Sequence, residues 1–533
     1  MSPRNGIVLL LAISALLFLA ACGGSGSKNS ATPPPSGGFT NSSLNGTYVF
    51  SFSGTDAANG TFFAMAGTIS ANGSGGLSGT VDIIDPAYGT TLLSQTLGNG
   101  SGYTVTQDGR GRGSLATGGA AGTIGIDFVL TSSSHGLITR FDATGTGSGT
   151  IDLQSSSVTQ SALGSYSFSV SGVDASVNPY AAAGNFTLGA TGTITAGFED
   201  FNDNRTPLTG GTLSGSVLLG APGAPGTATL SATGSPYGTA FDVFPIDSTH
   251  LKFIETDGLD ITVGDAFTQQ TSIAAGQLVY TMAGLDSSNG LQAEGGFLTY
   301  DGTSAISNGL EDINDGGNVA QSITVSGTLT ATTPGRYQMV LGNFYNGVGG
   351  ASGSYTFTAY PSSAGILLLE TDNLGVSAGA AFAQSATTFA SGQGYGLNLT
   401  GANSSGEVDD IAEFTANSGG SLSDGLVDEN DNASIAFDQK LGTGGTYSFD
   451  SSASGRGVLS YPATDTTLIG TLNLAFYVAN SSTVIFIDGD SGAQTGVGLF
   501  QVQSSSTSSA AIAHTTSHFA ALHAAAQHAG RKK

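Results

Sequence analysis

The sequence predicts an all-β protein made of four tandem antiparallel repeats, each a small eight-stranded meander barrel. Three observations predict this fold class: alternating apolar strands that end at glycine, copies of them spaced about 115 residues apart, and no helical periodicity between them. Gly supplies 83 of the 533 residues and charged residues only 10%. A two-sheet β-sandwich for each repeat stays as the alternative.

The first segment of the chain resembles the signal of a secreted protein. In residues 1–21, Arg4 precedes an apolar run of about 15 residues, which is short for a membrane-spanning helix and suits the core of a signal peptide. The sequence LAAC at 19–22 resembles the lipobox of bacterial lipoproteins. That resemblance implies cleavage before Cys22, lipidation of its sulfur and, with Gly23 next, sorting to the outer membrane.

Residues 22–43 are rich in Gly, Ser and Pro and predict a flexible linker between the lipid and the folded part. Acyl chains would therefore hold the protein on a membrane without a spanning segment, facing the periplasm or the cell surface. Cys22 is the single cysteine, so disulfides are excluded. A net charge of −25 argues against binding to nucleic acid.

Two sequence markers define the repeats. The opening strands end at Gly54, Gly172, Gly284 and Gly401, which are 118, 112 and 117 residues apart. The closing strands carry a glycine five residues before a glutamine, at Gly149–Gln154, Gly264–Gln269, Gly379–Gln384 and Gly496–Gln501. We therefore place the repeats at 44–160, 161–274, 275–391 and 392–503.

Within the first repeat, alternation identifies the strands. Tyr48, Phe50 and Phe52 share one face of the opening strand, while Ser51 and Ser53 share the other, which is typical of a half-buried antiparallel strand. Turns rich in glycine separate seven more expected strands, at 61–71, 76–84, 102–107, 112–117, 124–131, 136–142 and 149–154. Closure of eight strands into a barrel would remove exposed edges.

An acidic motif recurs where the third strand of each repeat is expected to end. Copies two to four carry Asp200, Asn202 and Asp203; Asp312, Asn314 and Asp315; and Asp428, Asn430 and Asp431. Oxygen ligands at alternate positions suit Ca²⁺, which is the one cofactor that the sequence suggests. The competing interpretation is a turn, because Asp and Asn bond to their own backbone. The first copy carries Asp82 and Asp85 but has Ile84 in place of asparagine.

A second acidic position follows the seventh expected strand, at Asp142, Asp257, Asp372 and Asp490. Copies two to four also carry an acid two residues earlier, whereas the first copy has Arg140 there. Paired carboxylates can hydrolyse glycosides, so a carbohydrate-active hydrolase of the envelope is the alternative function. Recurrence in four equivalent places indicates a role in the fold instead, and we expect no catalytic residue.

Basic and histidine residues give weaker signals. Arg110, Arg112, Arg336 and Arg456 lie beside glycines and suit either solvated hairpins or a carboxylate partner. His135 and His250 hold equivalent positions that Gly365 and Thr483 fill in the later copies, which is typical of exposed turns.

The tail, 504–533, is rich in alanine and predicts a short helix. His514 and His518 are four residues apart in it and could bind a transition metal.

These observations together predict a membrane-tethered lipoprotein of the cell envelope, with tandem β-domains in a structural, adhesive or ligand-binding role and no enzymatic activity. Its expected contacts are the membrane, through the lipid, and a polysaccharide or protein ligand. A membrane-spanning β-barrel is disfavoured because only 8% of the residues are aromatic.

Overall fold

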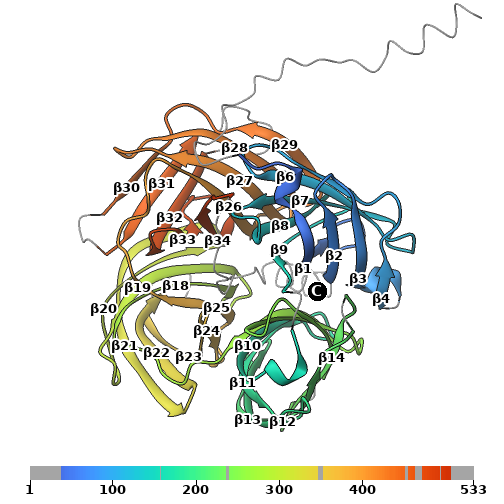
Figure 1. Ribbon diagram of the computed structural model, residues 1–533. Helices are drawn as coiled ribbons and strands as arrows, with labels where there is room; N and C mark the ends of the chain where they lie inside the picture. The colour runs from blue at the N-terminus through green and yellow to red at the C-terminus, as the bar shows by residue number, and fades with distance from the viewer. Residues whose placement is uncertain are drawn as a thin grey trace, which may run out of the picture. The chain divides into compact units, whose positions relative to one another are not determined.

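A computed structural model describes residues 38–89, 91–155, 158–221, 223–235, 239–345, 352–450, 454–462, 471–492 and 494–505. These residues form antiparallel strands and three single-turn 3-10 helices, η1 (Asn41–Ser43), η2 (Pro86–Tyr88) and η3 (Gln160–Ala162). The predicted fold class is confirmed: the strands fall into four successive sheets, one for each repeat (Figure 1). None of the described helices is long and apolar enough to cross a membrane.

Repeats 2 and 3 are closed eight-stranded barrels in which consecutive strands pair and the last strand returns to the first. Figure 1 looks along the barrel of repeat 2. Its strands are β10 (Ser165–Val173), β11 (Pro179–Leu188), β12 (Ile194–Asp203), β13 (Thr206–Leu218), β14 (Gly226–Ala232), β15 (Ala240–Pro245), β16 (His250–Glu255) and β17 (Ile261–Thr268). Those of repeat 3 are β18 (Gly276–Leu285), β19 (Leu291–Tyr300), β20 (Ala305–Asp315), β21 (Asn318–Thr333), β22 (Arg336–Tyr345), β23 (Ser352–Ser362), β24 (Gly365–Glu370) and β25 (Val376–Ala383).

Repeats 1 and 4 are nine-stranded sheets in which the first and last strands also pair. Repeat 1 contains β1 (Asn45–Asp56), β2 (Thr61–Asn72), β3 (Leu77–Ile84), β4 (Leu92–Thr96), β5 (Gly102–Val105), β6 (Arg110–Ala116), β7 (Thr123–Leu130), β8 (His135–Asp142) and β9 (Gly145–Leu153). Repeat 4 contains β26 (Gln393–Ala402), β27 (Glu407–Ala416), β28 (Leu422–Asp431), β29 (Ser434–Lys440), β30 (Thr446–Phe449), β31 (Arg456–Pro462), β32 (Thr471–Asn480), β33 (Thr483–Asp488) and β34 (Thr495–Val502).

The extra strand arises because the long fourth strand of repeats 2 and 3 is broken in two. The break falls at Gly98–Gly100 in repeat 1 and at Gly442–Gly445 in repeat 4, and glycine weakens a strand interior. The two pieces pair with opposite neighbours, β4 with β3 and β5 with β6. Single bridges, Gly76 to Gly102 and Ser421 to Thr446, link β5 and β30 to the residue that precedes the third strand, β3 or β28.

All eight strands predicted for the first repeat are present, and β4 is the one that the sequence analysis missed. Leu92–Thr96 contains a residue with positive φ, Ser94, and lies in a polar stretch without clear alternation. The predicted C-terminal helix lies outside the described residues.

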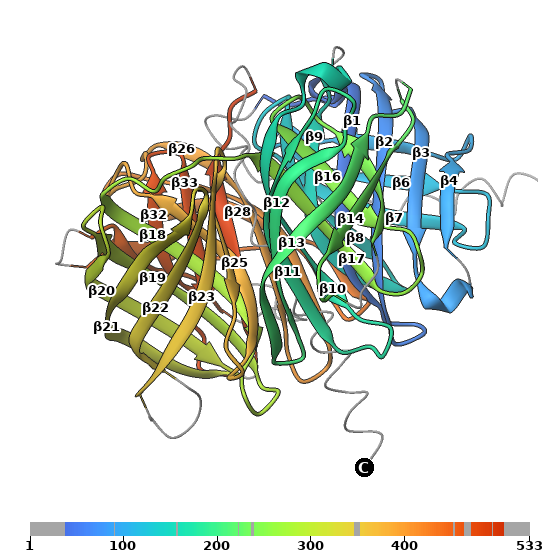
Figure 2. The same ribbon diagram turned by 90° about the horizontal axis from the view of Figure 1, so that it is seen from below.

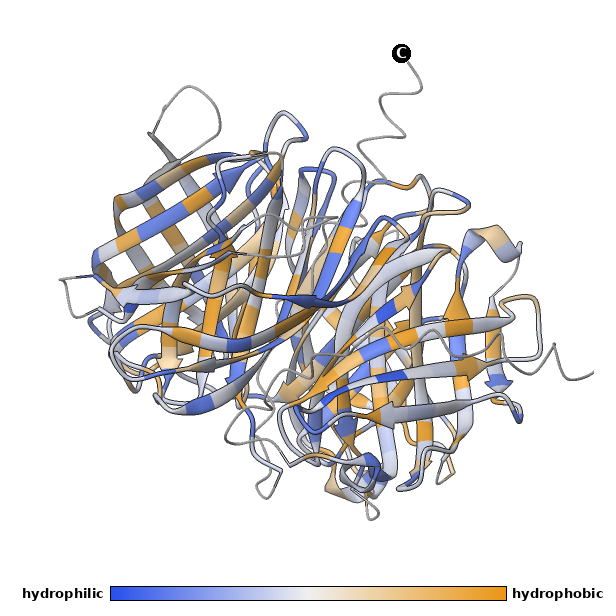
Figure 3. Ribbon diagram, turned by 90° about the horizontal axis from the view of Figure 1, so that it is seen from above, coloured by the Kyte–Doolittle hydropathy of each residue, from blue (hydrophilic) through white to orange (hydrophobic). Residues whose placement is uncertain are grey.

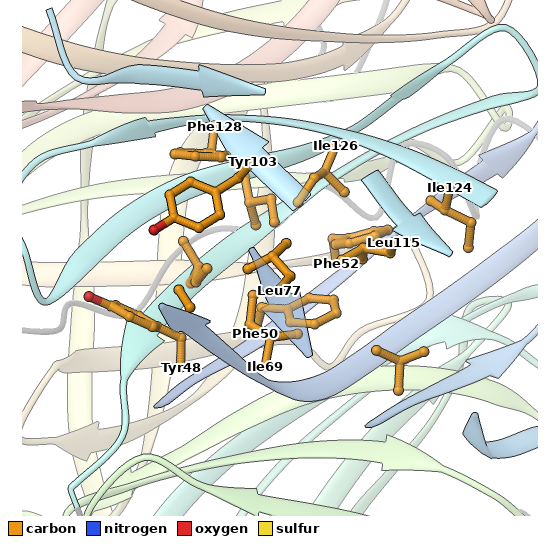
Figure 4. Close-up of a cluster of buried hydrophobic side chains, with 14 of the residues drawn as sticks. Tyr48, Phe50, Phe52, Ile69, Leu77, Tyr103, Leu115, Ile124, Ile126 and Phe128 are labelled. Atoms are coloured by element: carbon orange, nitrogen blue, oxygen red, sulfur yellow. The ribbon is translucent and has the colours of Figure 1, made fainter. Parts of the chain in front are cut away.

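Each repeat encloses its own apolar core. In repeat 1, Tyr48, Phe50 and Phe52 point inward, as predicted, against side chains from β3, β6 and β7 (Figure 4). Hydropathy alternates along many of the strands in Figure 3, as expected when one face of each strand is buried in a barrel. The interior of the repeat 3 barrel keeps a cavity of only about 10 Å³. Its lumen is therefore filled by side chains.

The outer faces of the barrels also pack against one another. Strands one to three of each repeat contact strands near the end of the next repeat, and repeat 4 contacts repeat 1 through β27 and β7–β9. In Figure 2 the strands of each repeat can be followed side by side. The four repeats thus form a closed circuit of contacts within the compact unit Pro33–Lys533.

This packing corrects one prediction. Ser51 and Ser53 were expected on a solvated face, yet both are only 5% exposed. Small side chains let neighbouring barrels approach closely, and Val49 beside them packs against Phe244 and Ile254 of repeat 2.

Candidate functional site: the junctions between repeats

We call the contact between successive repeats a junction and number it by its two repeats: 1–2, 2–3, 3–4 and 4–1. Every junction contains an equivalent backbone hydrogen bond, which the N–H of the residue two positions beyond a closing strand donates. The four bonds are Ser155 to Ile246, Gln270 to Pro361, Ser385 to Ala479 and Ser504 to Thr131. Junction 4–1 therefore repeats the geometry of the other three and closes the circuit.

The acidic motif lies at the end of the third strand, where Asn314 and Asn430 accept N–H groups of the following turn, from Gly317 and Ala433. In repeat 1, Asp82 lies in β3, and Asp85 of the motif follows the strand and accepts the N–H of Ala87. A β-bulge stands opposite the first aspartate of the motif, where the fourth strand places a residue at positive φ. The N–H of that residue donates to the aspartate in all four repeats: Ser94 to Asp82, Gly210 to Asp200, Ser322 to Asp312 and Asp438 to Asp428. The aspartate thus accepts the backbone N–H of the bulge residue, in place of a partner in the sheet.

Three of these aspartates also bind an arginine of the next repeat. At junction 2–3, Nη2 of Arg336 lies 2.8 Å from Oδ1 of Asp200, and Nε donates to Oδ2 at 2.9 Å. At junction 3–4, Arg456 binds Asp312 in the same bidentate way at 2.9 and 2.7 Å. The hydroxyl groups of Tyr360 and Tyr477 donate to the same two carboxylates.

Junction 4–1 uses two arginines. Nη1 of Arg110 lies 2.8 Å from Oδ2 of Asp428, and Nη2 of Arg112 lies 2.9 Å from Oδ1. Asp438 accepts from both guanidinium groups. Burial alone would lower the pKa of Arg110, but Asp428 and its other acidic neighbours raise it well above its usual value. Charge attraction therefore stabilises the closure of the circuit.

The asparagine of the motif completes each of these three junctions. Its side-chain amide donates to backbone carbonyls of the next repeat: Asn202 to Glu370 and Gly375, Asn314 to Asp488 and Gln494, and Asn430 to Arg140 and Gly145. All three asparagines have 0% exposure. Because the donors and acceptors are buried, each bond is costly to leave unmade.

The closing glutamines bind across the junctions as well. Gln154 donates to the carbonyl of Pro245, and Gln384 donates to those of Ser454 and Val478. In repeat 4 this role belongs to Gln503, which donates to Asp108 and Leu130. Gln501, the residue that the sequence spacing selects, lies two positions too early.

Junction 1–2 lacks the arginine and the asparagine. Ile84 replaces the asparagine and packs with Phe244, Ile246 and Ile254 of repeat 2. In place of an arginine, the carboxyl group of Asp242 faces Asp82. Burial raises the pKa of Asp82 to about 7, and the nearby Asp242 carboxyl adds to the shift.

A buried lysine supplies the positive charge at junction 1–2. Lys252, 1% exposed, donates to Oγ1 of Thr150 in repeat 1 at 2.7 Å and to Asp265 at 3.0 Å. His250 bonds to the same Asp265, and His135 bonds to Asp152 of repeat 1. The exposed turns predicted at these histidines are wrong, since each histidine is only 5% exposed. No pattern in the sequence marks Lys252.

The last acids of the motif do not join the first two. Asp203, Asp315 and Asp431 lie on the opposite face of their strands from the aspartate and asparagine that reach the next repeat. No group of three or more His, Cys, Asp or Glu side chains that could hold a metal occurs in the part of the chain that the structure describes. The calcium prediction stays untested, but arginines of the next repeat already supply a counter-ion to Asp200, Asp312 and Asp428.

The second acidic position also serves the barrel. Oδ2 of each acid accepts a backbone N–H from the preceding strand or from the residue just before it: Gly125 to Asp142, Thr239 to Asp257, Thr356 to Asp372 and Asn473 to Asp490. The acids two residues earlier, Glu255, Glu370 and Asp488, are each 1% exposed. Burial, assisted by Asp260, raises the pKa of Glu255 to about 9, and burial raises that of Asp488 to about 8.

Cys22, His514 and His518 lie outside the described residues, as do the signal peptide and the tail beyond residue 505.

No known family model and no curated protein matches the chain. Among solved structures, a transferrin-binding protein B mutant from Haemophilus parasuis is 9% identical, with a TM-score of 0.19 over 69% of this chain and 83% of that one. A double mutant of the same protein is 9% identical, with a TM-score of 0.18 over 71% and 82%. Kievitone hydratase from Nectria haematococca is 11% identical, with a TM-score of 0.16 over 65% and 91%. Scores this low carry no argument, so function is argued from the chain's own residues.

Proposed function

We propose that the protein is a lipid-anchored lipoprotein of the cell envelope, without enzymatic activity, whose four repeats form one rigid head that binds a ligand or serves a structural role. The observation that supports this most is the closed circuit of junctions. Because repeat 4 binds repeat 1 through the buried Arg110, separation of any two repeats must break buried ion pairs or hydrogen bonds. A head of this kind presents fixed surfaces to a polysaccharide or a protein.

The N-terminal sequence supplies the attachment. LAAC at 19–22 with the apolar run before it favours lipidation at Cys22, and the linker up to residue 43 would carry the head away from the bilayer.

The hydrolase alternative has less support. Glycoside hydrolysis requires two carboxyl groups that face one cleft. The paired acids at Glu255, Glu370 and Asp488 are instead buried in barrel walls, beside acids that accept backbone N–H groups. Asp200, Asp312 and Asp428 already accept hydrogen bonds from the bulge residue and from an arginine of the next repeat.

Replacement of Cys22 tests the attachment. Expressed in a bacterial host, Cys22→Ala should move the protein from the membrane fraction to the soluble fraction or leave its signal uncleaved, whereas the neighbouring Ser25→Ala control should behave like the native protein. Normal processing and unchanged membrane association of Cys22→Ala would contradict the proposal.

A further inference from the structure

The segment between β17 and β18, residues 269–275, borders a cleft of about 330 Å³ at one end of the repeat 3 barrel. The larger apolar side chains of its lining are those of Ile273 in this segment, Leu278, Ile366 and Phe382. Its polar lining consists of Gln270, Ser272, Ser362, Ser363, Asn480 and Thr483, the last two from repeat 4. None of the described residues that line the cleft is charged. Its volume falls within the range of small-molecule sites, which often occupy the mouths of β-barrels.

The corresponding ends of repeats 1 and 4 are filled by phenylalanine. Phe39, which precedes β1, is 1% exposed within the core of repeat 1. Phe389, which precedes β26, packs with its ring centroid 4.9 Å from that of Tyr447 and 5.5 Å from that of Phe500. In repeat 3 the segment before β18 contributes Ile273 instead. Its side chain is smaller than that of phenylalanine and reaches the core without filling the opening.

A second difference between the repeats leaves the same opening larger in repeat 3. In repeat 2, His250 stacks on Phe267 with a centroid distance of 4.3 Å. The equivalent pair in repeat 3 is Gly365 and Phe382, so no side chain covers the ring from that position. Gly365 has a φ of 141°, and a Cβ there would lie 2.9 Å from the Phe382 ring. The conformation and the contact both require glycine.

We propose that this cleft binds an uncharged, mainly hydrophobic small molecule. A charged ligand would lose its hydration with no charged group among the described lining residues to compensate it. A sugar would need many hydrogen-bond partners, whereas Ile273, Leu278, Ile366 and Phe382 offer hydrocarbon. The polar side chains of Ser272, Ser363, Asn480 and Thr483 suit a hydroxyl or carbonyl group on the ligand. This inference deepens the proposed function, on which it rests only for the idea of a ligand-binding head.

Fluorescence titration of the mature protein with N-phenyl-1-naphthylamine, a neutral hydrophobic probe, tests the site. We expect one saturable site in the native protein. Ile273→Phe, which reproduces the residue of repeats 1 and 4, should weaken binding by at least about tenfold. Ile273→Val leaves the cleft open and should change the affinity by less than about threefold. Phe389→Ala should add a second site, because it opens the matching end of repeat 4.

Circular dichroism melting of each variant separates loss of the site from loss of the fold. Native-like melting of Ile273→Phe together with weakened binding supports the site. Equal binding by Ile273→Phe and Ile273→Val, or absence of binding by the native protein, would overturn it. The charged probe 1-anilinonaphthalene-8-sulfonate should bind at least about tenfold more weakly than the neutral one, and the reverse order would also refute the proposal. Neither result affects the outcome of the Cys22 experiment, so the two proposals can fail separately.

Discussion

Removal of the arginine at junction 3–4 should destabilise the whole head. Arg456 is 8% exposed in its side chain and Asp312 is 0% exposed, and the two groups form a bidentate pair. Arg456→Met keeps most of the apolar stem but leaves the Asp312 carboxylate buried without its counter-ion. Loss of one partner of a buried pair costs about 3–5 kcal/mol. Tyr477 and the N–H of Ser322 still donate to Asp312, so we expect a value near the lower limit.

Urea unfolding followed by far-UV circular dichroism measures this cost. Arg112→Met is the comparison variant: its side chain is 39% exposed, its Nε lies 3.7 Å from the buried Asp127, and Arg110 also binds Asp428, so the loss should be smaller than that of Arg456→Met. The double variant Arg456→Met, Asp312→Asn should recover most of the loss, because the amide keeps an acceptor for Ser322 without the uncompensated charge. A cost below about 1 kcal/mol for Arg456→Met, or equal costs for both arginines, would refute the argument.

Three further outcomes follow. Burial raises the pKa of Glu199 and Glu429 to about 8, so these acids take up protons on folding. The melting temperature should therefore fall as the pH rises from about 5 to about 9. A melting temperature that rises over this range would contradict the prediction. Arginines already neutralise Asp200, Asp312 and Asp428, so calorimetry should show the same melting temperature in millimolar Ca²⁺ and in chelator. A clear rise of the melting temperature with Ca²⁺ would support the calcium interpretation. Isolated residues 161–274 should fold around their own core but melt below the full head, since Phe244 and Ala181 lose their partners; a melting temperature equal to that of the full head would argue against shared stability.

The sequence predicts the repeats well because each barrel obeys local rules. Alternation places Tyr48, Phe50 and Phe52 in a core, and glycine-rich turns separate the strands. What alternation cannot show is the environment of the other face. Ser51 and Ser53 read as solvated because small polar side chains suit water and a close barrel contact equally well.

The acidic motif was misjudged for a similar reason. Within one copy, Asp200 and Asn202 resemble a turn or a cation site, because their partners lie 136 residues away at Arg336 and about 170 away at Glu370 and Gly375. Local sequence contains no trace of so distant a partner. The second acidic position is easier to interpret: Asp142, Asp257, Asp372 and Asp490 accept backbone N–H groups of their own repeats, and recurrence at four equivalent places needs no distant partner.

One signal in the sequence does point to the junctions. The motif asparagine is absent from copy 1, where Ile84 stands, and the arginine that opens β6, β22 and β31 in copies 1, 3 and 4 is absent from copy 2, where Gly226 opens β14. Two unrelated losses in adjacent copies are unexpected if each residue serves its own repeat. They follow at once if the asparagine-bearing strand of one copy faces the arginine of the next, because a single junction, 1–2, then lacks both and uses Ile84 and Lys252 instead. The same rule requires a partner in another copy for Asp428 of the last repeat, and Arg110 of the first supplies it. Closure of the circuit is therefore the one arrangement in which every arginine and every asparagine of the set has a use.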